Sequence, residues 1–237
     1  MKQRTRVVLQ LAALFLALGA SALADSNAYL YIVHAIPGRD IADNLNPGLP
    51  VDVLINGKSC LVHGLTFANT SGPLTLAAGT YDVEISLANT LQPCTNATLA
   101  ASQVTLTPGE SLSAVAAITS TQPALLQFTD DLAPVVPGNA RFVLVNSADA
   151  PALEATLTPV GVKNPPTFSG SADPNTQTAI PVPAGTYLVQ ITALGSTTVL
   201  TSVEIALTDQ SVTLSYASGE TVNNTIGLVN RTIRDVF

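Results

Sequence analysis

The chain has 237 residues, of which 47% are hydrophobic, 11% charged and 5% aromatic, and its formal net charge is −7. This composition excludes an intrinsically disordered chain, because disorder requires low hydrophobicity and high charge. The acidic excess argues against nucleic acid or anionic lipid as a partner, since both favour clustered Lys and Arg. The abundance of Thr, Val, Pro and Gly favours strands and turns over helices.

Residues 1–24 have the pattern of a signal peptide. Three cations precede an apolar run at 7–18, and the small-x-small pattern of a signal peptidase site follows at 20–24. The run is shorter than the roughly 20 residues that span a bilayer, so we predict cleavage before Asp25 and no membrane insertion afterwards. The remaining 213 residues carry a net charge of −10, because the leader removes three cations. We expect export to the periplasm, the cell surface or the extracellular space.

The first predicted strand of the mature chain covers residues 31–35 and contains His34. We interpret His34 as a structural histidine that bonds to a loop, with Asp40 or Asp52 as candidate partners and a binding site as the alternative. The next loop, residues 40–46, is rich in oxygen-bearing side chains. It lacks the spacing of an EF-hand loop, so a polar turn is favoured over a calcium site.

Two features follow in chain order. Asn56-Gly57 comes directly after the predicted strand 51–55 and is the strongest two-residue hairpin signal in the chain. The only two cysteines, Cys60 and Cys94, lie 34 positions apart. An exported protein favours a disulfide between them, and closing such a loop contributes about 4 kcal/mol in the chain-entropy model.

A metal site at the cysteines is the alternative to the disulfide. A zinc site would need two more ligands, and the only histidines are His34 and His63. The sequence therefore predicts no metal site.

A glycine precedes the clearest strand pattern in the chain. After Gly79, Tyr81 and the apolar residues that follow it alternate with polar residues up to Leu87, which is typical of a half-buried strand. We predict that Gly79 provides the turn conformation before this strand. We also predict that Tyr81 is a structural residue, buried with its hydroxyl bonded to nearby backbone.

The pattern of residues 74–86 recurs at 180–192, a shift of 106 positions. Gly185 and Tyr187 correspond to Gly79 and Tyr81, and the same structural roles are predicted for them. The repeat divides the mature chain into a first module at 25–133, a Pro-rich linker at 134–138 and a second module at 139–237.

Short strands, frequent turns and about 100 residues per module predict an all-β protein with two tandem immunoglobulin-like antiparallel β-sandwich modules. In the second module, alternation at 203–207 and at 212–216 predicts a hairpin around Thr208.

One position suggests an interface. Where the first module has Asp82 on the predicted solvent face, the second has Leu188. We predict that Leu188 packs against the other module or a partner, and a lone exposed leucine is the alternative. The prolines of the linker would limit how the modules are oriented.

Three segments of the first module carry a family resemblance: residues 31–37 (YIVHAIP), 50–58 (PVDVLINGK) and 77–83 (AAGTYDV). They resemble the DUF4397 family of secreted bacterial and archaeal domains. The second copy keeps 145–151 (VNSADAP) and 183–187 (PAGTY) but lacks the Asn-Gly turn, so it is the more diverged copy. The resemblance implies secreted or surface β-sandwich modules, and it implies no particular reaction.

The residues that usually carry catalysis do not form a recognisable pattern. A Ser-His-Asp site would need one of the two histidines, and no Gly-x-Ser-x-Gly motif is present. We predict no catalytic residue and no cofactor. The favoured reading is an exported, non-enzymatic structural or binding protein with an unknown surface or envelope partner. An exported hydrolase or a carbohydrate-binding accessory protein is the alternative.

Overall fold

The computed structural model describes residues 26–234 and is all-β apart from one short helix, α1 (Gly38–Ile41). The predicted signal peptide lies outside the described residues. Within residues 26–234, no helix has the length and apolar character needed to cross a membrane.

The first eight strands form two four-stranded sheets with the orders β4-β1-β7-β8 and β3-β2-β5-β6. These strands are β1 (Asn27–His34), β2 (Val51–Ile55), β3 (Ser59–Leu65), β4 (Thr70–Ala77), β5 (Gly79–Leu87), β6 (Thr98–Leu106), β7 (Ser111–Thr119) and β8 (Gln122–Thr129). Strands β1 and β7 run parallel, and the other pairs are antiparallel.

The last eight strands repeat this topology, with the orders β12-β9-β15-β16 and β11-β10-β13-β14. They are β9 (Asn139–Asn146), β10 (Leu153–Pro159), β11 (Phe168–Ala172), β12 (Gln177–Pro183), β13 (Gly185–Ala193), β14 (Val199–Leu207), β15 (Val212–Ser218) and β16 (Gly227–Ile233). Each strand number is eight higher than its counterpart, and β9 and β15 form the parallel pair. The two halves of the chain are called the first and second modules below.

Within each module the two sheets pack face to face and bury an apolar core. In the first module that core includes Leu30 from β1, Val53 from β2 and Ile85 from β5. The core of the second module is built in the same way, around residues such as Phe142 and Val189. Each module is therefore a β-sandwich.

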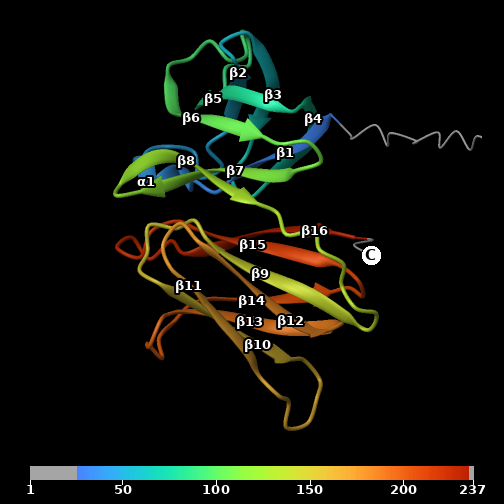
Figure 1. The fold of residues 1–237 in the computed structure, drawn as a ribbon. Helices are drawn as coiled ribbons and strands as arrows, with labels where there is room; N and C mark the ends of the chain where they lie inside the picture. Colours follow the sequence, from blue (N-terminus) through green and yellow to red (C-terminus); the bar gives the residue numbers. More distant parts are fainter. Residues whose placement is uncertain (1–25, 235–237) are drawn as a thin grey trace, which may run out of the picture.

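A third apolar cluster lies between the modules and joins residues of β1, β7 and β8 to residues of β9, β15 and β16. We call β4-β1-β7-β8 and β12-β9-β15-β16 the inner sheets, and the other two the outer sheets. Figure 1 shows the resulting stack of four layers, with the two inner sheets facing each other in the middle.

Two turn predictions have opposite outcomes. The hairpin at Asn56-Gly57 is confirmed: it joins β2 to β3, and both residues have the positive φ (52° and 61°) that a type I′ turn requires. The hairpin around Thr208 is wrong, because β14 pairs with β13 in the outer sheet whereas β15 pairs with β9 and β16 in the inner sheet. Alternation shows that a strand has a buried face, but it does not identify the strand's neighbour.

Leu188 lies in β13 of the outer sheet, opposite Thr158 and Glu204. Its neighbours Tyr187 and Val189 point into the core of the second module, so the half-buried Leu188 points away from it. The modules meet through the inner sheets instead. Leu188 therefore takes no part in the contact between the modules, and its contact with a separate partner stays a prediction.

Candidate functional site

Asp52 organises one edge of the first module. Its side chain is buried in β2, 1% exposed, and accepts hydrogen bonds from the backbone N–H groups of Gly64 (2.9 Å), Asn89 (3.0 Å) and Cys94 (2.9 Å). Burial alone would raise the pKa of Asp52, but these three bonds and the nearby His63 outweigh it and lower the pKa below its ordinary value. The carboxylate thus ties β3 to the loop that contains Cys94.

A β-bulge in β3 brings Cys60 and His63 to the same face. Cys60 is paired with Leu54 and Val62 with Val53, so Leu61 is an extra residue in β3. In a regular strand, residues three apart point to opposite faces. The extra residue restores a common face, and accordingly Val62 is buried while His63 is exposed and Cys60 partly exposed.

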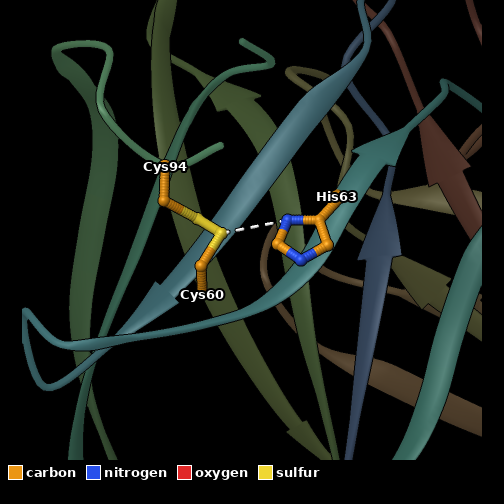
Figure 2. A group of neighbouring side chains, drawn as sticks. All are labelled: Cys60, His63 and Cys94. Carbon is orange, nitrogen blue, oxygen red and sulfur yellow. Dashed lines mark hydrogen bonds between the residues drawn. A yellow bond between two sulfur atoms is a disulfide. The ribbon is translucent and has the colours of Figure 1, made fainter. Parts of the chain in front are cut away.

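Cys60, His63 and Cys94 form a compact cluster on this outer face (Figure 2). Cys60 and Cys94 are joined by a disulfide, with their Cα atoms 5.9 Å apart. The imidazole of His63 points at the sulfur of Cys60, and its Nδ1 lies 3.1 Å from that sulfur. The three donor atoms lie within 4.8 Å of one another. The sequence predicts the disulfide, which is confirmed, but it indicates no role for His63.

A shallow hollow of about 230 Å³ lies beside this cluster. Its lining includes Asp52, His63 and residues of the loop after β5: Ala88, Asn89, Thr90 and Pro93. The cluster is therefore open to small solutes on one side.

The two predicted structural tyrosines bond to equivalent positions. The hydroxyl of Tyr81 donates to the carbonyl of Ala77, and that of Tyr187 to the carbonyl of Pro183, both at 2.7 Å. Each bond reaches back over the glycine that begins the strand. The modules differ in burial, because Tyr187 is 2% exposed whereas Tyr81 is only partly buried.

The glycines before these tyrosines are less alike than the sequence suggests. Gly79 has a φ of +157°, a value that residues with a side chain rarely adopt, whereas Gly185 is not among the residues with positive φ. A Cβ atom at either position would meet the following tyrosine ring at an ordinary contact distance, 3.9 Å and 3.7 Å respectively. Only Gly79 therefore has a backbone reason to be glycine.

His34 is fully buried at the end of β1. Its Nε2 lies 2.7 Å from the carbonyl oxygen of Leu49, and its Nδ1 lies 3.3 Å from the backbone N–H of Ile36. This pattern has Nε2–H donating to the carbonyl and Nδ1 accepting. Burial lowers the pKa of the imidazole and outweighs the bond to Leu49, which raises it. The ring binds loop backbone, so the candidate partners Asp40 and Asp52 were wrong.

The corresponding residue in the second module, Asn146, has a similar role. It is fully buried at the end of β9, and its Nδ2 donates to the carbonyls of Pro151 (3.0 Å) and Ala172 (3.1 Å). Two different polar residues thus anchor a loop at the same place in the two modules.

The contact between the modules has an apolar part and a polar part. The apolar part combines Val33, Val115 and Phe128 of the first module with Leu214 and Val229 of the second. Val135 of the predicted linker is also buried there. Val135 thus anchors an otherwise exposed linker to the interface.

The polar part is centred on a buried ion pair. Arg231 of β16 lies 2.6 Å from the carboxylate of Asp130, and their side chains are 7% and 0% exposed. Arg231 Nη2 also donates to the hydroxyl of Ser113 (2.9 Å). The Ser113 oxygen in turn lies 2.7 Å from both Asp130 and the hydroxyl of Tyr216. Arg231 of the second module thus bonds to Asp130 and Ser113 of the first. Tyr216 of the second module also bonds to Ser113.

The guanidinium of Arg231 also lies over the ring of Tyr31 in β1, 3.7 Å from its centroid, as in a cation–π contact. Gly72 in β4 leaves room for this ring, because a Cβ atom at that position would lie 2.8 Å from the carbonyl oxygen of Leu30 and 3.0 Å from the ring. We call Tyr31, Ser113, Asp130, Tyr216 and Arg231 the interface lock.

Sequence reasoning missed the interface lock, although one signal was present. Arg231 alternates in phase with Val229 and Ile233, that is, with the apolar side of its strand. A cation in the apolar phase of a strand predicts a buried charge with a partner. Asp130 lies near the end of the predicted first module, just before the linker, where no pattern in the sequence indicates that it is buried.

One end of the interface is acidic. Asp40 of α1 accepts a hydrogen bond from the hydroxyl of Thr225 (2.9 Å), and Asp149 accepts one from the backbone N–H of Thr121 (3.0 Å), so both bonds join the two modules. Glu220 is 2% exposed nearby. Burial raises its pKa, and the charges of Asp40 and Asp149 raise it further.

Comparisons with known proteins give one match to a family. The model of a domain of unknown function, DUF4397, matches residues 28–156, which span the first module and continue through β9 into β10. No curated protein matches the sequence.

Among solved structures, the Bacillus anthracis TIE protein is 12% identical with a TM-score of 0.26, and the match covers 82% of this chain and 33% of that one. This chain therefore spans about a third of the length of that protein. A proposed adhesin of Bacteroides ovatus is also 12% identical with a TM-score of 0.26, over 88% of this chain and 95% of its own. A Streptococcal ancillary pilin is 11% identical with a TM-score of 0.20, over 82% and 62%. No shared function follows from scores this low.

Proposed function

The chain belongs to the DUF4397 family, a domain of unknown function, and from its own structure we propose that it is an exported, non-enzymatic structural or binding protein of the cell envelope or extracellular space. The disulfide between Cys60 and Cys94 supports the exported location, because disulfides persist in oxidising compartments. The signal-peptide pattern of residues 1–24 supports it independently.

The observation that carries the proposal is the interface between the modules. It combines an apolar cluster that includes Val135 of the linker with the interface lock. A buried ion pair with ordered hydrogen bonds favours one arrangement of the groups around it over others. The two modules therefore act as one stiff unit that holds its two outer sheets at opposite ends, which suits a spacer or a presenting scaffold.

The use of the buried polar side chains supports the non-enzymatic part of the proposal. His34 binds two backbone groups, and Asp52 binds three. Asp130 is occupied by Arg231 and two serines. A catalytic group needs a free proton site facing substrate, and these groups use theirs to hold loops and modules together.

We further propose that the second module is a diverged copy of the first and that both are immunoglobulin-like. The identical strand orders support the duplication. So do the equivalent bonds of Tyr81 and Tyr187, since each hydroxyl donates to the carbonyl four residues before it.

Binding to the cell envelope tests the function. The purified chain without residues 1–24 is labelled and added to intact cell-envelope fractions of the source organism, and bound label is measured against concentration. We expect saturable binding that unlabelled protein displaces. Binding that rises linearly without saturation would contradict a specific binding role. Release of soluble fragments from the envelope in proportion to time would instead indicate a hydrolase.

A pair of variants locates the binding face. Leu188→Asp puts a charge on the outer sheet of the second module without touching the interface lock. If this sheet contacts the partner, the variant should bind at least tenfold more weakly. Asp82→Leu, at the equivalent position of the first module, is the matched control and should bind like the wild type. Equal binding by all three proteins would exclude the outer face around Leu188 as the contact surface.

A further inference from the structure

The cluster of Cys60, His63 and Cys94 has a second chemical form, in which the disulfide is reduced to two thiols. In the disulfide form its two sulfur atoms are bonded to each other and the imidazole of His63 lies against one of them. Breaking the S–S bond would leave two thiols and one imidazole on the same surface patch. We propose that the dithiol form of this chain binds one Zn²⁺ ion through the sulfur atoms of Cys60 and Cys94 and through Nδ1 of His63.

The donor atoms suit this ion. Zinc in proteins takes sulfur at about 2.3 Å and imidazole nitrogen at about 2.0–2.1 Å in tetrahedral geometry. Such a site separates its two sulfurs by about 3.8 Å and each sulfur from the nitrogen by about 3.6 Å. Nδ1 of His63 already lies 3.1 Å from the sulfur of Cys60, and the two cysteine Cα atoms are 5.9 Å apart. Rotation of the side chains is therefore sufficient to reach the ligand positions.

The backbone around the cluster is held by bonds that do not depend on the disulfide. Asp52 accepts the N–H of Cys94 itself and the N–H of Gly64, the residue after His63. The bulge at Leu61 keeps Cys60 and His63 on one face. Reduction removes none of these features, so the three ligands stay near one another in the dithiol form. A ligand set that is already assembled loses less entropy when the metal binds.

The change of state balances as two reactions. A phosphine reductant and water cleave the S–S bond: the sulfurs gain two electrons and two hydrogens as thiols, and phosphorus is oxidised to the phosphine oxide. Zn²⁺ then replaces the two thiol protons, which are released to solvent, and accepts the lone pair of His63 Nδ1. A newly exported chain that has not yet formed the disulfide needs only the second reaction.

The ion would close the same loop that the disulfide closes. It would leave one coordination position for water, because two thiolates and one imidazole fill three of the four. His63 is exposed and the adjacent hollow is open, so this position faces solvent.

The test is a zinc titration of residues 25–237, in the oxidised form and after reduction with a phosphine. Free Zn²⁺ is measured with a chromophoric chelator, and Co²⁺ is used in parallel as a spectroscopic probe. We expect the reduced protein to bind one equivalent of Zn²⁺ and to show a sulfur-to-cobalt charge-transfer band. The oxidised protein should show neither. Equal zinc binding by both forms, or none by the reduced form, would overturn the proposal.

Two variants test the role of the histidine. His63→Gln keeps both thiols and should weaken Zn²⁺ binding by at least about tenfold, since even an outer-shell partner of a zinc ligand contributes 10–100-fold in affinity. Lys58→Gln, an exposed change in the same hairpin, should leave the affinity unchanged. Wild-type affinity in His63→Gln would show that the histidine is not a ligand and would overturn the three-ligand site.

Loss of structure on reduction would not make the test uninformative. If the reduced chain loses β-structure by circular dichroism, the proposal requires added Zn²⁺ to restore it in the wild type and not in His63→Gln. Failure of Zn²⁺ to restore the structure of the reduced wild type would count against the site.

Discussion

Two buried carboxylates, Asp52 and Glu220, have opposite effects on the stability of the fold. Asp52 accepts three backbone N–H groups, which hold its pKa below the ordinary value of 3.8. Burial raises the pKa of Glu220 above 4.5, and the nearby charges of Asp40 and Asp149 raise it further. A buried carboxylate thus stabilises the folded state in one place and destabilises it in the other, depending on the groups that face it.

Asp52→Asn should lower the free energy of unfolding by about 1.5–3 kcal/mol at pH 7. The amide nitrogen of Asn would replace one of the two acceptor oxygens and leave its backbone N–H partners without an acceptor. The other oxygen would still accept, but without a charge. A carboxylate whose pKa is lowered on folding stabilises the protein fully above its unfolded value and loses this effect as the pH falls through the folded value. The difference from wild type should therefore be full at pH 7 and shrink below pH 3.8. Urea unfolding at several pH values measures it, and a pH-independent difference would contradict the assignment.

Glu220→Gln should behave in the opposite way. Because folding raises the pKa of Glu220, the charged form destabilises the protein as the pH rises above 4.5. The variant should unfold at higher urea concentration than wild type at pH 8 and at about the same concentration at pH 4. Asp173→Asn, at an exposed carboxylate, is the control and should match wild type at both. A less stable Glu220→Gln at pH 8 would refute the expectation.

The two tyrosines allow a comparison at equivalent sites. Tyr187→Ala should cost about 3–5 kcal/mol, as expected for a large-to-small change in a core. Tyr81→Ala should cost distinctly less, because that ring is only partly buried. The sequence predicted both hydroxyl bonds but could not predict this difference. Equal losses in thermal unfolding would show that the hydroxyl bond, which the two share, dominates over ring burial.

At the scale of the strand, the bulge in β3 is a feature that the alternation of polar and apolar residues could not predict. Alternation correctly predicts that β5 buries Val83 and Ile85. The same rule places Cys60 and His63 on opposite faces, because a bulge has no reliable sequence signal. The disulfide could be predicted from composition and compartment, whereas the histidine beside it depends on one extra residue in the strand.

Deleting Leu61 tests the bulge. Cys60 and Val62 would then pair with consecutive residues of β2, Leu54 and Val53, with Cys60 still outward and Val62 still inward, so the disulfide should form and the melting temperature should change little. Deleting Asp82 from β5, which is paired regularly around that position, would shift every following side chain to the other face and should unfold the module. Mass spectrometry of the disulfide and thermal unfolding report both outcomes. Similar damage from the two deletions would argue against the bulge.

At the scale of the whole molecule, the sequence predicted two modules but not the faces through which they meet. One signal was available: every residue of β15 and nearly every residue of β7 is buried. Small and apolar residues on both sides of a strand indicate a sheet that is covered on both faces. Leu188 was predicted as the contact because it is an apolar residue at a position where the first module has Asp82. Strands β7 and β15 of the interface have no exposed face on which such a residue could stand out.

The interface lock predicts strong coupling between its charged partners. Arg231→Met should cost about 3–5 kcal/mol, because it leaves Asp130 buried without a counter-charge. Adding Asp130→Leu should recover part of this loss, so the double variant is more stable than the sum of the single ones predicts. Thermal unfolding measures the coupling, and small-angle scattering should show a larger radius of gyration for Arg231→Met. Additive losses with unchanged scattering would mean that the pair does not hold the modules together.

The corresponding sheets of the two modules cover each other, since β4-β1-β7-β8 faces β12-β9-β15-β16. In an isologous dimer, two subunits meet through the same surface patch. The two modules meet in this way within a single chain, so each module takes the place of one subunit. Two chains that open at the linker would present the same pair of faces to each other. Refolding at high protein concentration should therefore yield some module-swapped dimer, in which the interface is intact but joins different chains.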